Sequence, residues 1–145
     1  VEVVPLLVPD YNDSRTELEE MACFIASVSP DIPWHLSAFY PTYKMTDRGR
    51  TPQSSLLEAA RIGREAGVRY VYLGNMPGNV GEFEHTHCHS CGRMLIKRYG
   101  YIILEYHIND QGSCPSCGTR IPGVWTDDPD GVNLKGSGFP RSDRC

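Results

Sequence analysis

Two short motifs organise this chain: Cys88-His-Ser-Cys91-Gly92 and Cys114-Pro-Ser-Cys117-Gly118, with 22 residues between Cys91 and Cys114. Paired Cys-x-x-Cys motifs are typical of a four-thiolate metal site, because each pair lies on a tight turn that directs both sulfurs to one point. The glycine after each pair permits the backbone conformation that closes such a turn. The spacing therefore predicts one metal ion held by Cys88, Cys91, Cys114 and Cys117. Zinc is the first expectation and iron in a rubredoxin-like site the main rival, since both accept tetrahedral sulfur; two disulfides in a secreted protein are a third interpretation.

The segment between the two motifs predicts a β-hairpin. Met94–Arg98 and Tyr101–Tyr106 are rich in β-branched and aromatic residues, and Gly100 marks the turn between them. A segment of about 40 residues buries too little apolar surface to fold alone, so we expect the metal to hold residues 85–125 together as a zinc ribbon. Four thiolates leave no open coordination position, which predicts a structural metal. The neighbouring histidines (His85, His87 and His89) could replace a cysteine, but we interpret them as solvated loop residues.

The preceding residues predict alternating strands and helices. Three apolar runs read as strands, namely Val1–Val8, Pro33–Tyr40 and Val68–Gly74. Ser14 and Glu17 form a capping box that opens a helix ending at Ser29, and Thr51-Pro52 opens a second helix that ends at Gly67. The order β-α-β-α-β is that of a parallel α/β unit, and the continuous apolar run Val1–Val8 predicts a strand covered on both faces. We expect residues 1–76 to form this domain, 77–84 a linker and 126–145 a flexible tail.

The second predicted strand carries a candidate functional histidine. Trp34, Leu36 and Ala38 alternate with His35 and Ser37, so the apolar set should pack under the helices and the polar pair should face the other side. That side is a barrel lumen or a ligand cleft in α/β folds. His35 is either a ligand-facing residue or a hydrogen-bonded core histidine.

The loop after this strand is the second candidate in the α/β domain. It leaves the carboxyl end of a strand, where α/β folds place their chemistry. Lys44 and Asp47 are the loop residues with functional potential. A solvated loop pair is the alternative interpretation of both.

Composition places the chain among ordinary globular proteins. It has 145 residues, 40% hydrophobic and 22% charged, with a net charge of −4, which argues against nucleic acid as a general partner. No apolar run reaches transmembrane length and no signal peptide is visible. Thiolates committed to a metal imply a reducing compartment, so we expect a cytoplasmic protein. We interpret Cys23 as a small buried hydrophobic residue, and Cys145 lies at the carboxyl terminus. A sequence that begins at Val1 without Met indicates a piece of a longer protein.

Several segments together resemble a known enzyme family. They are Leu7–Ser14, Pro33–Ser37, Tyr43–Asp47, Tyr70–Asn75 and Ile121–Trp125. From Val1 to Trp125 the chain resembles the carboxy-terminal part of radical S-adenosylmethionine enzymes. The most similar branch is that of the AmmeMemoRadiSam system, whose members are commonly labelled pyruvate formate-lyase-activating-enzyme-like.

The resemblance implies a partial TIM-type (β/α) barrel that contains the last strands. In that family a C-x-x-x-C-x-x-C motif holds a [4Fe-4S] cluster, which binds S-adenosylmethionine and reduces it to a 5′-deoxyadenosyl radical. This chain has no such motif and no Gly-Gly-Glu motif, so by itself it should not perform radical chemistry. It is then either the carboxy-terminal fragment of an enzyme whose amino-terminal barrel segment is missing here, or a truncated relative that keeps only the scaffold.

The resemblance also implies three cofactor-binding residues. Val8 ends a strand whose backbone flanks the adenine in this family, and Asn12 follows it. His35 resembles a histidine near the cofactor in activating enzymes. The plain alternatives are that Val8 is core, Asn12 a helix-entry residue and His35 a core histidine.

Partners follow from the same resemblance and from the predicted sheet. The enzyme interpretation implies a protein substrate. The alternatives are a stand-alone zinc-ribbon module that binds a protein or nucleic acid, and a rubredoxin-like electron carrier. An incomplete parallel sheet beginning at Val1 should also self-associate through its exposed edge or be covered by the tail.

Overall fold

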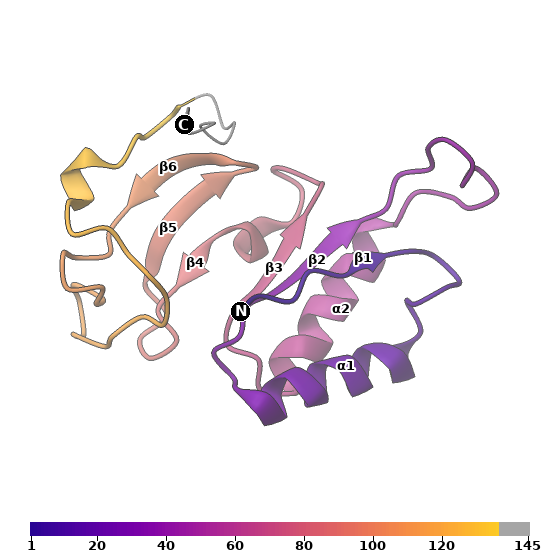
Figure 1. The fold of residues 1–145 in the computed structure, drawn as a ribbon, viewed down its shortest axis with the longest axis horizontal. Coiled ribbons are helices and arrows are strands. Elements are labelled where there is room, and N and C mark those ends of the chain that lie inside the picture. The colour runs from indigo at the N-terminus through magenta and orange to yellow at the C-terminus, as the bar shows by residue number, and fades with distance from the viewer. Residues whose placement is uncertain (137–145) are drawn as a thin grey trace. The chain divides into compact units, whose positions relative to one another are not determined.

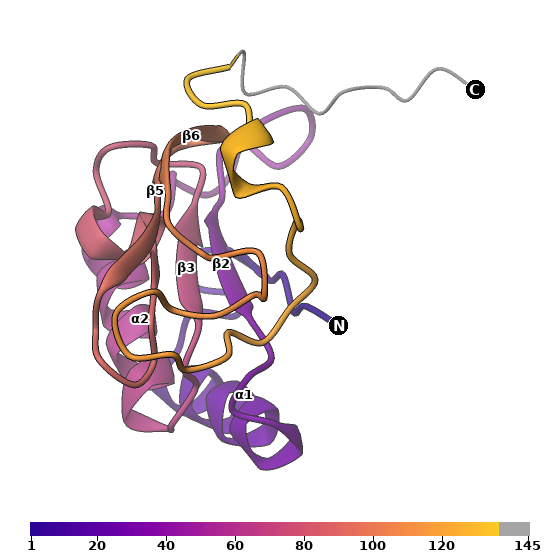
Figure 2. The same ribbon diagram turned by 90° about the vertical axis from the view of Figure 1, so that its left-hand side faces the viewer.

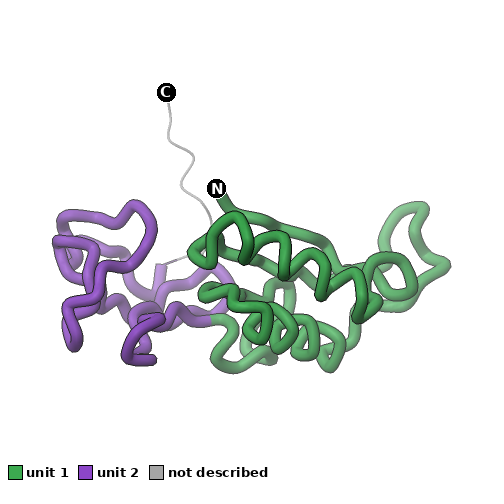
Figure 3. Tube along the Cα trace, turned by 90° about the horizontal axis from the view of Figure 1, so that it is seen from below, with its two compact units in different colours: residues 1–84 green, residues 85–145 purple. Residues whose placement is uncertain are grey.

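The computed structural model describes residues 1–136 and divides the chain into two compact units, Val1–Glu84 and His85–Cys145 (Figure 3). Each unit has its own β-sheet, and within residues 1–136 both α-helices lie in the first unit. The chain is thus a mixed α/β protein. Over residues 1–136, no helix combines the length and the apolar character needed to cross a membrane.

The first unit is a three-stranded parallel sheet with two helices (Figure 1). Its elements are β1 (Leu6–Leu7), α1 (Arg15–Val28), β2 (Trp34–Ala38), α2 (Gln53–Glu65), β3 (Val71–Gly74) and the 3₁₀ helix η1 (Gly81–Glu84). The strands lie in chain order, β1-β2-β3. The described residues of this unit form an open sheet and not a closed barrel.

Both helices pack on one face of this sheet. The core contains Leu7 from β1, alternate residues of β2 and β3, and the buried sides of α1 and α2. On β2 the buried residues are Trp34, Leu36 and Ala38, as the alternation predicts. His35 and Ser37 pair in register with Tyr72 and Gly74 on the face away from the helices.

The first helix follows its capping box but buries less of its length than predicted. The Ser14 hydroxyl accepts from the Glu17 N–H at 3.4 Å and donates to the Glu17 carboxylate at 2.6 Å, so the predicted start is confirmed. The buried residues of α1 are Leu18, Ala22 and Ile25. Cys23 is exposed, which corrects the expectation that it is buried, because the buried stripe of α1 runs through Leu18, Ala22 and Ile25.

The first strand is shorter and more open than the run Val1–Val8 predicts. Regular pairing is confined to Leu6–Leu7, preceded by an isolated bridge between Val3 and Trp34. Val4 and Leu6 are 62% and 45% exposed, so this run is covered on one face and not on both. The prediction of a strand covered on both faces was wrong, because a strand at a sheet edge can carry apolar side chains on its uncovered face.

Thr51 does not cap the second helix as predicted. The N-cap residue is Pro52, which makes no side-chain capping bond, and α2 begins at Gln53. The Thr51 hydroxyl instead accepts from the Phe39 N–H at 2.7 Å and donates to the Leu7 carbonyl at 2.5 Å. The side chain therefore bridges the carboxyl ends of β1 and β2, where these two backbone groups do not reach each other directly.

The segment expected to be a linker, residues 77–84, belongs to the first unit. Val80 is 2% exposed and lies in the core with Met76. The Glu84 carboxylate accepts from the Gly78 N–H at 3.0 Å and so fastens η1 to the preceding turn. A Gly- and Pro-containing composition indicates turns, and here the turns fold back onto the sheet.

The second unit is an antiparallel sheet of order β4-β5-β6. Its strands are β4 (Thr86–His87), β5 (Met94–Tyr99) and β6 (Ile102–Tyr106), and Figure 2 shows β5 and β6 as its long hairpin. The predicted hairpin is confirmed, with its turn at Gly100 (φ +56°). Among residues 85–136 few large apolar side chains are fully buried, namely Leu95, Ile96, Ile108 and Ile121.

The start of the predicted flexible tail has defined structure. Pro129–Gly131 form a short 3₁₀ helix, η2, whose Gly131 N–H donates to the Asp128 carboxylate at 3.1 Å. Further on, the Lys135 N–H donates to the Ile103 carbonyl of β6 at 2.8 Å. Residues 126–136 are therefore folded against the second unit, and the remainder of the predicted tail, Cys145 included, lies outside the described residues.

Candidate metal centre

The four cysteines of the two motifs come together at one point in the second unit. Their sulfur atoms all lie within 4.8 Å of one another. Two separations join the two motifs: Cys88 to Cys117 at 3.6 Å and Cys91 to Cys114 at 3.7 Å. All four are free cysteines, and both separations are far longer than the roughly 2.05 Å of a disulfide bond, so the disulfide interpretation is wrong for the structure described.

Each motif forms the same closed turn. The Cys88 N–H donates to the Arg93 carbonyl and the Gly92 N–H to the Cys88 carbonyl, both at 2.9 Å. In the second motif the equivalent bonds, from Cys114 to Thr119 and from Gly118 to Cys114, are also 2.9 Å. Gly92 and Gly118 adopt φ values of +74° and +73°, a conformation that is costly for a residue with a side chain.

The two turns are also linked to each other through side chains. The Arg93 guanidinium of the first turn donates to the Ser116 hydroxyl of the second. The first cysteine of each turn is buried, with Cys88 2% and Cys114 0% exposed, and the second is exposed. One edge of the sulfur cluster therefore faces the unit's interior and the other faces solvent.

The sulfur positions fit a tetrahedral metal. Zinc–sulfur bonds of about 2.3 Å set sulfur–sulfur edges of about 3.8 Å. Two of the observed separations are 3.6 Å and 3.7 Å, and all lie within 4.8 Å. Among residues 1–136 this is the one group of three or more potential ligands that converges. His85, His87 and His89 are not in it, and the His85 Nδ1 accepts from the Arg98 N–H at 3.2 Å instead.

The pKa values of two thiols in this cluster, Cys117 and Cys91, are shifted in opposite directions. The hydrogen bond between the Cys117 thiol and the Thr119 hydroxyl, 3.3 Å apart, and a second one with the Thr119 backbone lower the pKa of Cys117 from 9.0 to about 6. At Cys91 the Arg93 N–H lowers the pKa, but hydrogen bonds with the other three sulfurs, together with desolvation, raise it to about 12. Four sulfurs at these distances share protons, and a divalent cation among them would displace those protons.

We expect bound zinc to protect Cys91 and Cys117 from iodoacetamide at pH 7. Both side chains are exposed, so burial does not shield them, and a thiolate that is bound to a metal is not free to act as a nucleophile. Mass spectrometry of peptides after brief labelling, with and without a chelator, checks this protection. Equal labelling of Cys91 and Cys117 in the two samples would contradict it.

The structure gives Val8 and Asn12 a local backbone role. The Val8 N–H donates to Asn12 Oδ1 at 2.8 Å, and Asn12 Nδ2 donates to the Leu6 carbonyl at 3.0 Å. Val8 is 7% exposed. The Val8 N–H, at the end of the strand whose backbone flanks the adenine in the resembled family, is therefore occupied by a side chain four residues away. The Asn12 side chain contacts the end of β1.

His35 lies on the face of the sheet away from the helices, as the alternation predicts. Its ring stacks on Tyr72, with ring centroids 4.9 Å apart, and its Nε2 is 3.5 Å from a carboxylate oxygen of Glu2. A histidine between an aromatic ring and a carboxylate can bind a ligand or exchange a proton. Val8 and Asn12 therefore lie together at the end of β1. His35 lies on β2 and has other neighbours, Tyr72 and Glu2.

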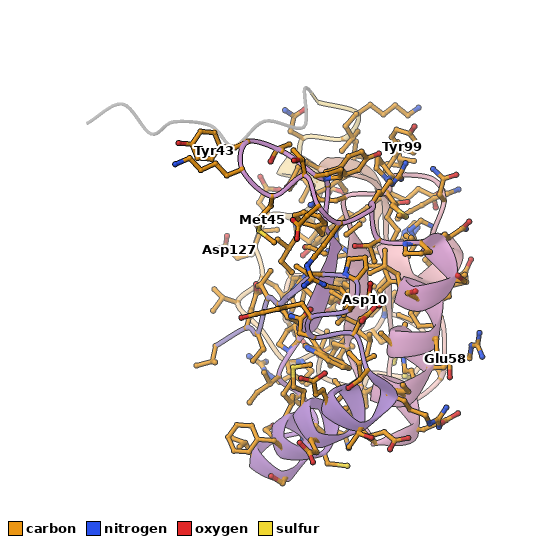
Figure 4. All side chains as sticks on the ribbon, turned by 90° about the vertical axis from the view of Figure 1, so that its right-hand side faces the viewer. Asp10, Tyr43, Met45, Glu58, Tyr99 and Asp127 are labelled. Atoms are coloured by element: carbon orange, nitrogen blue, oxygen red, sulfur yellow. The ribbon has the colours of Figure 1, made fainter. Side chains whose placement is uncertain are left out.

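The candidate residues of the loop after β2 do not converge. Tyr43 lies at the outer part of this loop with Met45 near it (Figure 4), and Tyr43 is 87% exposed. Lys44 lies over the Tyr43 ring at 5.3 Å, while Asp47 is 3.9 Å from Arg48. These are the contacts of solvated loop side chains.

Comparisons with known proteins place a relative among the archaea. No family model and no solved structure matches the sequence. A curated protein of Methanocaldococcus jannaschii, described as uncharacterized, is 38% identical over 123 residues. The match covers 83% of this chain but 36% of the relative. The chain therefore spans about a third of the length of the curated protein to which it is similar.

Proposed function

We propose that the second unit binds one zinc ion through Cys88, Cys91, Cys114 and Cys117, and that the zinc is structural. The observation that carries this proposal is the convergence of four sulfurs within 4.8 Å on two matching turns. Four sulfurs complete a tetrahedron and leave no position for water or substrate. Few apolar side chains are fully buried among residues 85–136, so this unit needs a further source of stability, which the metal would supply.

Metal analysis of protein purified from cells tests this proposal. We expect one zinc per chain and no visible absorption. The exposure of Cys91 and Cys117 favours one alternative, a rubredoxin-like electron carrier, because exposed sulfur gives electrons a route to the metal. Stoichiometric iron with the colour of a ferric–sulfur site would support that alternative and contradict the zinc proposal.

We further propose that residues 1–76 are the last strands of a radical S-adenosylmethionine-type barrel. Consecutive parallel strands lie in chain order, and both helices cover one face. With right-handed crossovers this arrangement is that of a (β/α) barrel, whose other face is the lumen. His35 lies on that face, and the longer archaeal relative leaves room for further strands.

In such a barrel the [4Fe-4S] cluster and S-adenosylmethionine would be held by strands outside this sequence. No C-x-x-x-C-x-x-C motif is present here, so this chain would contribute His35 and the carboxyl-terminal wall, and the family's chemistry would require the amino-terminal segment. A protein substrate is part of the same proposal. The competing proposal, a stand-alone zinc-ribbon binding module in the cytoplasm, needs no such segment.

Immunoblotting of native cells with an antibody to this chain distinguishes the enzyme proposal from the binding-module proposal. A band near the size of a full barrel, about 250 residues or more, supports the enzyme proposal. A band at 16.2 kDa contradicts it and leaves the binding module.

A further inference from the structure

The two cysteines of each metal-binding motif differ in their access to solvent. Cys88 is 2% and Cys114 0% exposed, whereas Cys91 and Cys117 are exposed. We call Cys88 and Cys114 the inner cysteines, and Cys91 and Cys117 the outer cysteines. An oxidant dissolved in water therefore reaches one sulfur of each motif and not the other.

Each outer sulfur lies beside an inner sulfur of the other motif. Cys117 is 3.6 Å from Cys88, and Cys91 is 3.7 Å from Cys114. A disulfide bond is about 2.05 Å long, so the two sulfurs of a pair need to approach each other by about 1.6 Å to form one. Such a bond would join the same two turns that the metal joins.

We propose that the four-cysteine cluster is a redox switch, in which hydrogen peroxide oxidises an outer cysteine, the inner cysteine beside it completes a disulfide, and zinc is released. The bond forms between Cys117 and Cys88 or between Cys91 and Cys114. Either bond removes two of the four ligands. The switch rests on the proposed zinc site and adds a response of the site's own residues to oxidants.

The electrons and atoms of this reaction balance. An outer sulfur that dissociates from zinc enters solvent as a thiolate and attacks peroxide; the O–O bond breaks, a sulfenic acid forms on the sulfur and hydroxide leaves. The inner thiolate then attacks the sulfenic sulfur, the S–O bond breaks and a second hydroxide leaves. Two thiolates lose two electrons and peroxide gains them. Because the outer sulfur must first leave the metal, bound zinc slows this oxidation as it slows alkylation.

Zinc release should loosen the second unit alone. A structural zinc site needs all four of its ligands, and for a small domain the free energy of metal binding is also free energy of folding. The first unit is a separate compact unit with its own core. We therefore expect oxidation to lower amide protection in residues 85–136 and to leave residues 1–84 unchanged.

Peroxide treatment of the zinc-loaded 145-residue chain tests the switch. During prolonged treatment with excess hydrogen peroxide we expect one zinc per chain to appear in solution, measured with a chromogenic chelator against an untreated sample. A phosphine reductant and added zinc should restore the starting zinc content. Cys23→Ser, which removes an exposed thiol on α1 outside the cluster, is the matched control and should release zinc like the wild type.

Tryptic peptides of the unmodified chain locate the new bond. Trypsin cleaves after lysine and arginine, and so places the two motifs in different peptides, residues 70–93 and residues 99–120. A disulfide between the motifs links these two peptides, whereas a disulfide within a motif leaves them separate. Mass spectrometry without reduction should find the linked pair after peroxide treatment and not before it.

The switch and the proposed zinc site fail separately in this experiment. A chain that takes up no zinc before treatment would contradict both. A chain that binds zinc but retains it under prolonged peroxide treatment, or that yields only the separate peptides with internal disulfides, would overturn the switch and leave the structural zinc site in place.

Discussion

Replacing Cys114 with serine should unfold residues 85–136 while residues 1–84 keep their structure. Cys114 is fully buried at the cluster, and the hydroxyl of serine is a poor zinc ligand. Structural zinc contributes about 10–16 kcal/mol in small zinc-finger peptides, more than the free energy of unfolding of most small domains. Hydrogen exchange resolved by residue checks the result: amide protection in β5 and β6 should vanish and that in β2 and α2 should remain.

Cys23→Ser is the matched control, because Cys23 is an exposed free thiol on α1. It should bind the same amount of zinc as the wild type and retain all amide protection. A chelator should reproduce the effect of Cys114→Ser. If β5 and β6 stayed protected in Cys114→Ser, the metal would not hold this unit together.

Replacing Thr51 with valine should destabilise the first unit by about 2–6 kcal/mol, since it leaves two buried backbone groups without partners at about 1–3 kcal/mol each. Thr51 is fully buried, and its hydroxyl connects the Phe39 N–H to the Leu7 carbonyl. Valine has nearly the same shape, so the loss reports the hydroxyl and not a cavity. Denaturant unfolding of the zinc-loaded protein, followed at the buried Trp34, measures this change.

Thr51→Ser keeps the hydroxyl and should lose less than half as much stability as Thr51→Val. Equal losses in the two variants would mean that the methyl group, and not the hydrogen-bonded bridge, is what the fold requires. Neither variant should change zinc content, because the bridge and the cysteines belong to different units.

Local features of this protein could be predicted from sequence. The two cysteine turns depend on residues within five positions of each other, and Gly92 and Gly118 have the positive φ that such turns need. The capping box at Ser14 and the alternation on β2 are likewise local patterns, and the structure contains both. A structural feature whose interacting residues lie within a few positions of each other can be predicted from the local sequence.

Features that depend on distant partners could not be read in this way. Thr51 beside Pro52 looks like a helix cap, yet its hydroxyl contacts a carbonyl 44 positions earlier. Residues 77–84 look like a linker because the sequence reveals their turns. It does not reveal the core into which Val80 packs. The apolar run at the start of the chain likewise does not say which face of its strand is covered.

X-ray absorption at the zinc edge of the purified protein is the most direct test of the central claim. The account predicts four sulfur ligands at about 2.3 Å and no nitrogen or oxygen ligand. A first shell with histidine nitrogen, or with three sulfurs and a water oxygen, would contradict a closed structural site and would point to a metal that is open to chemistry.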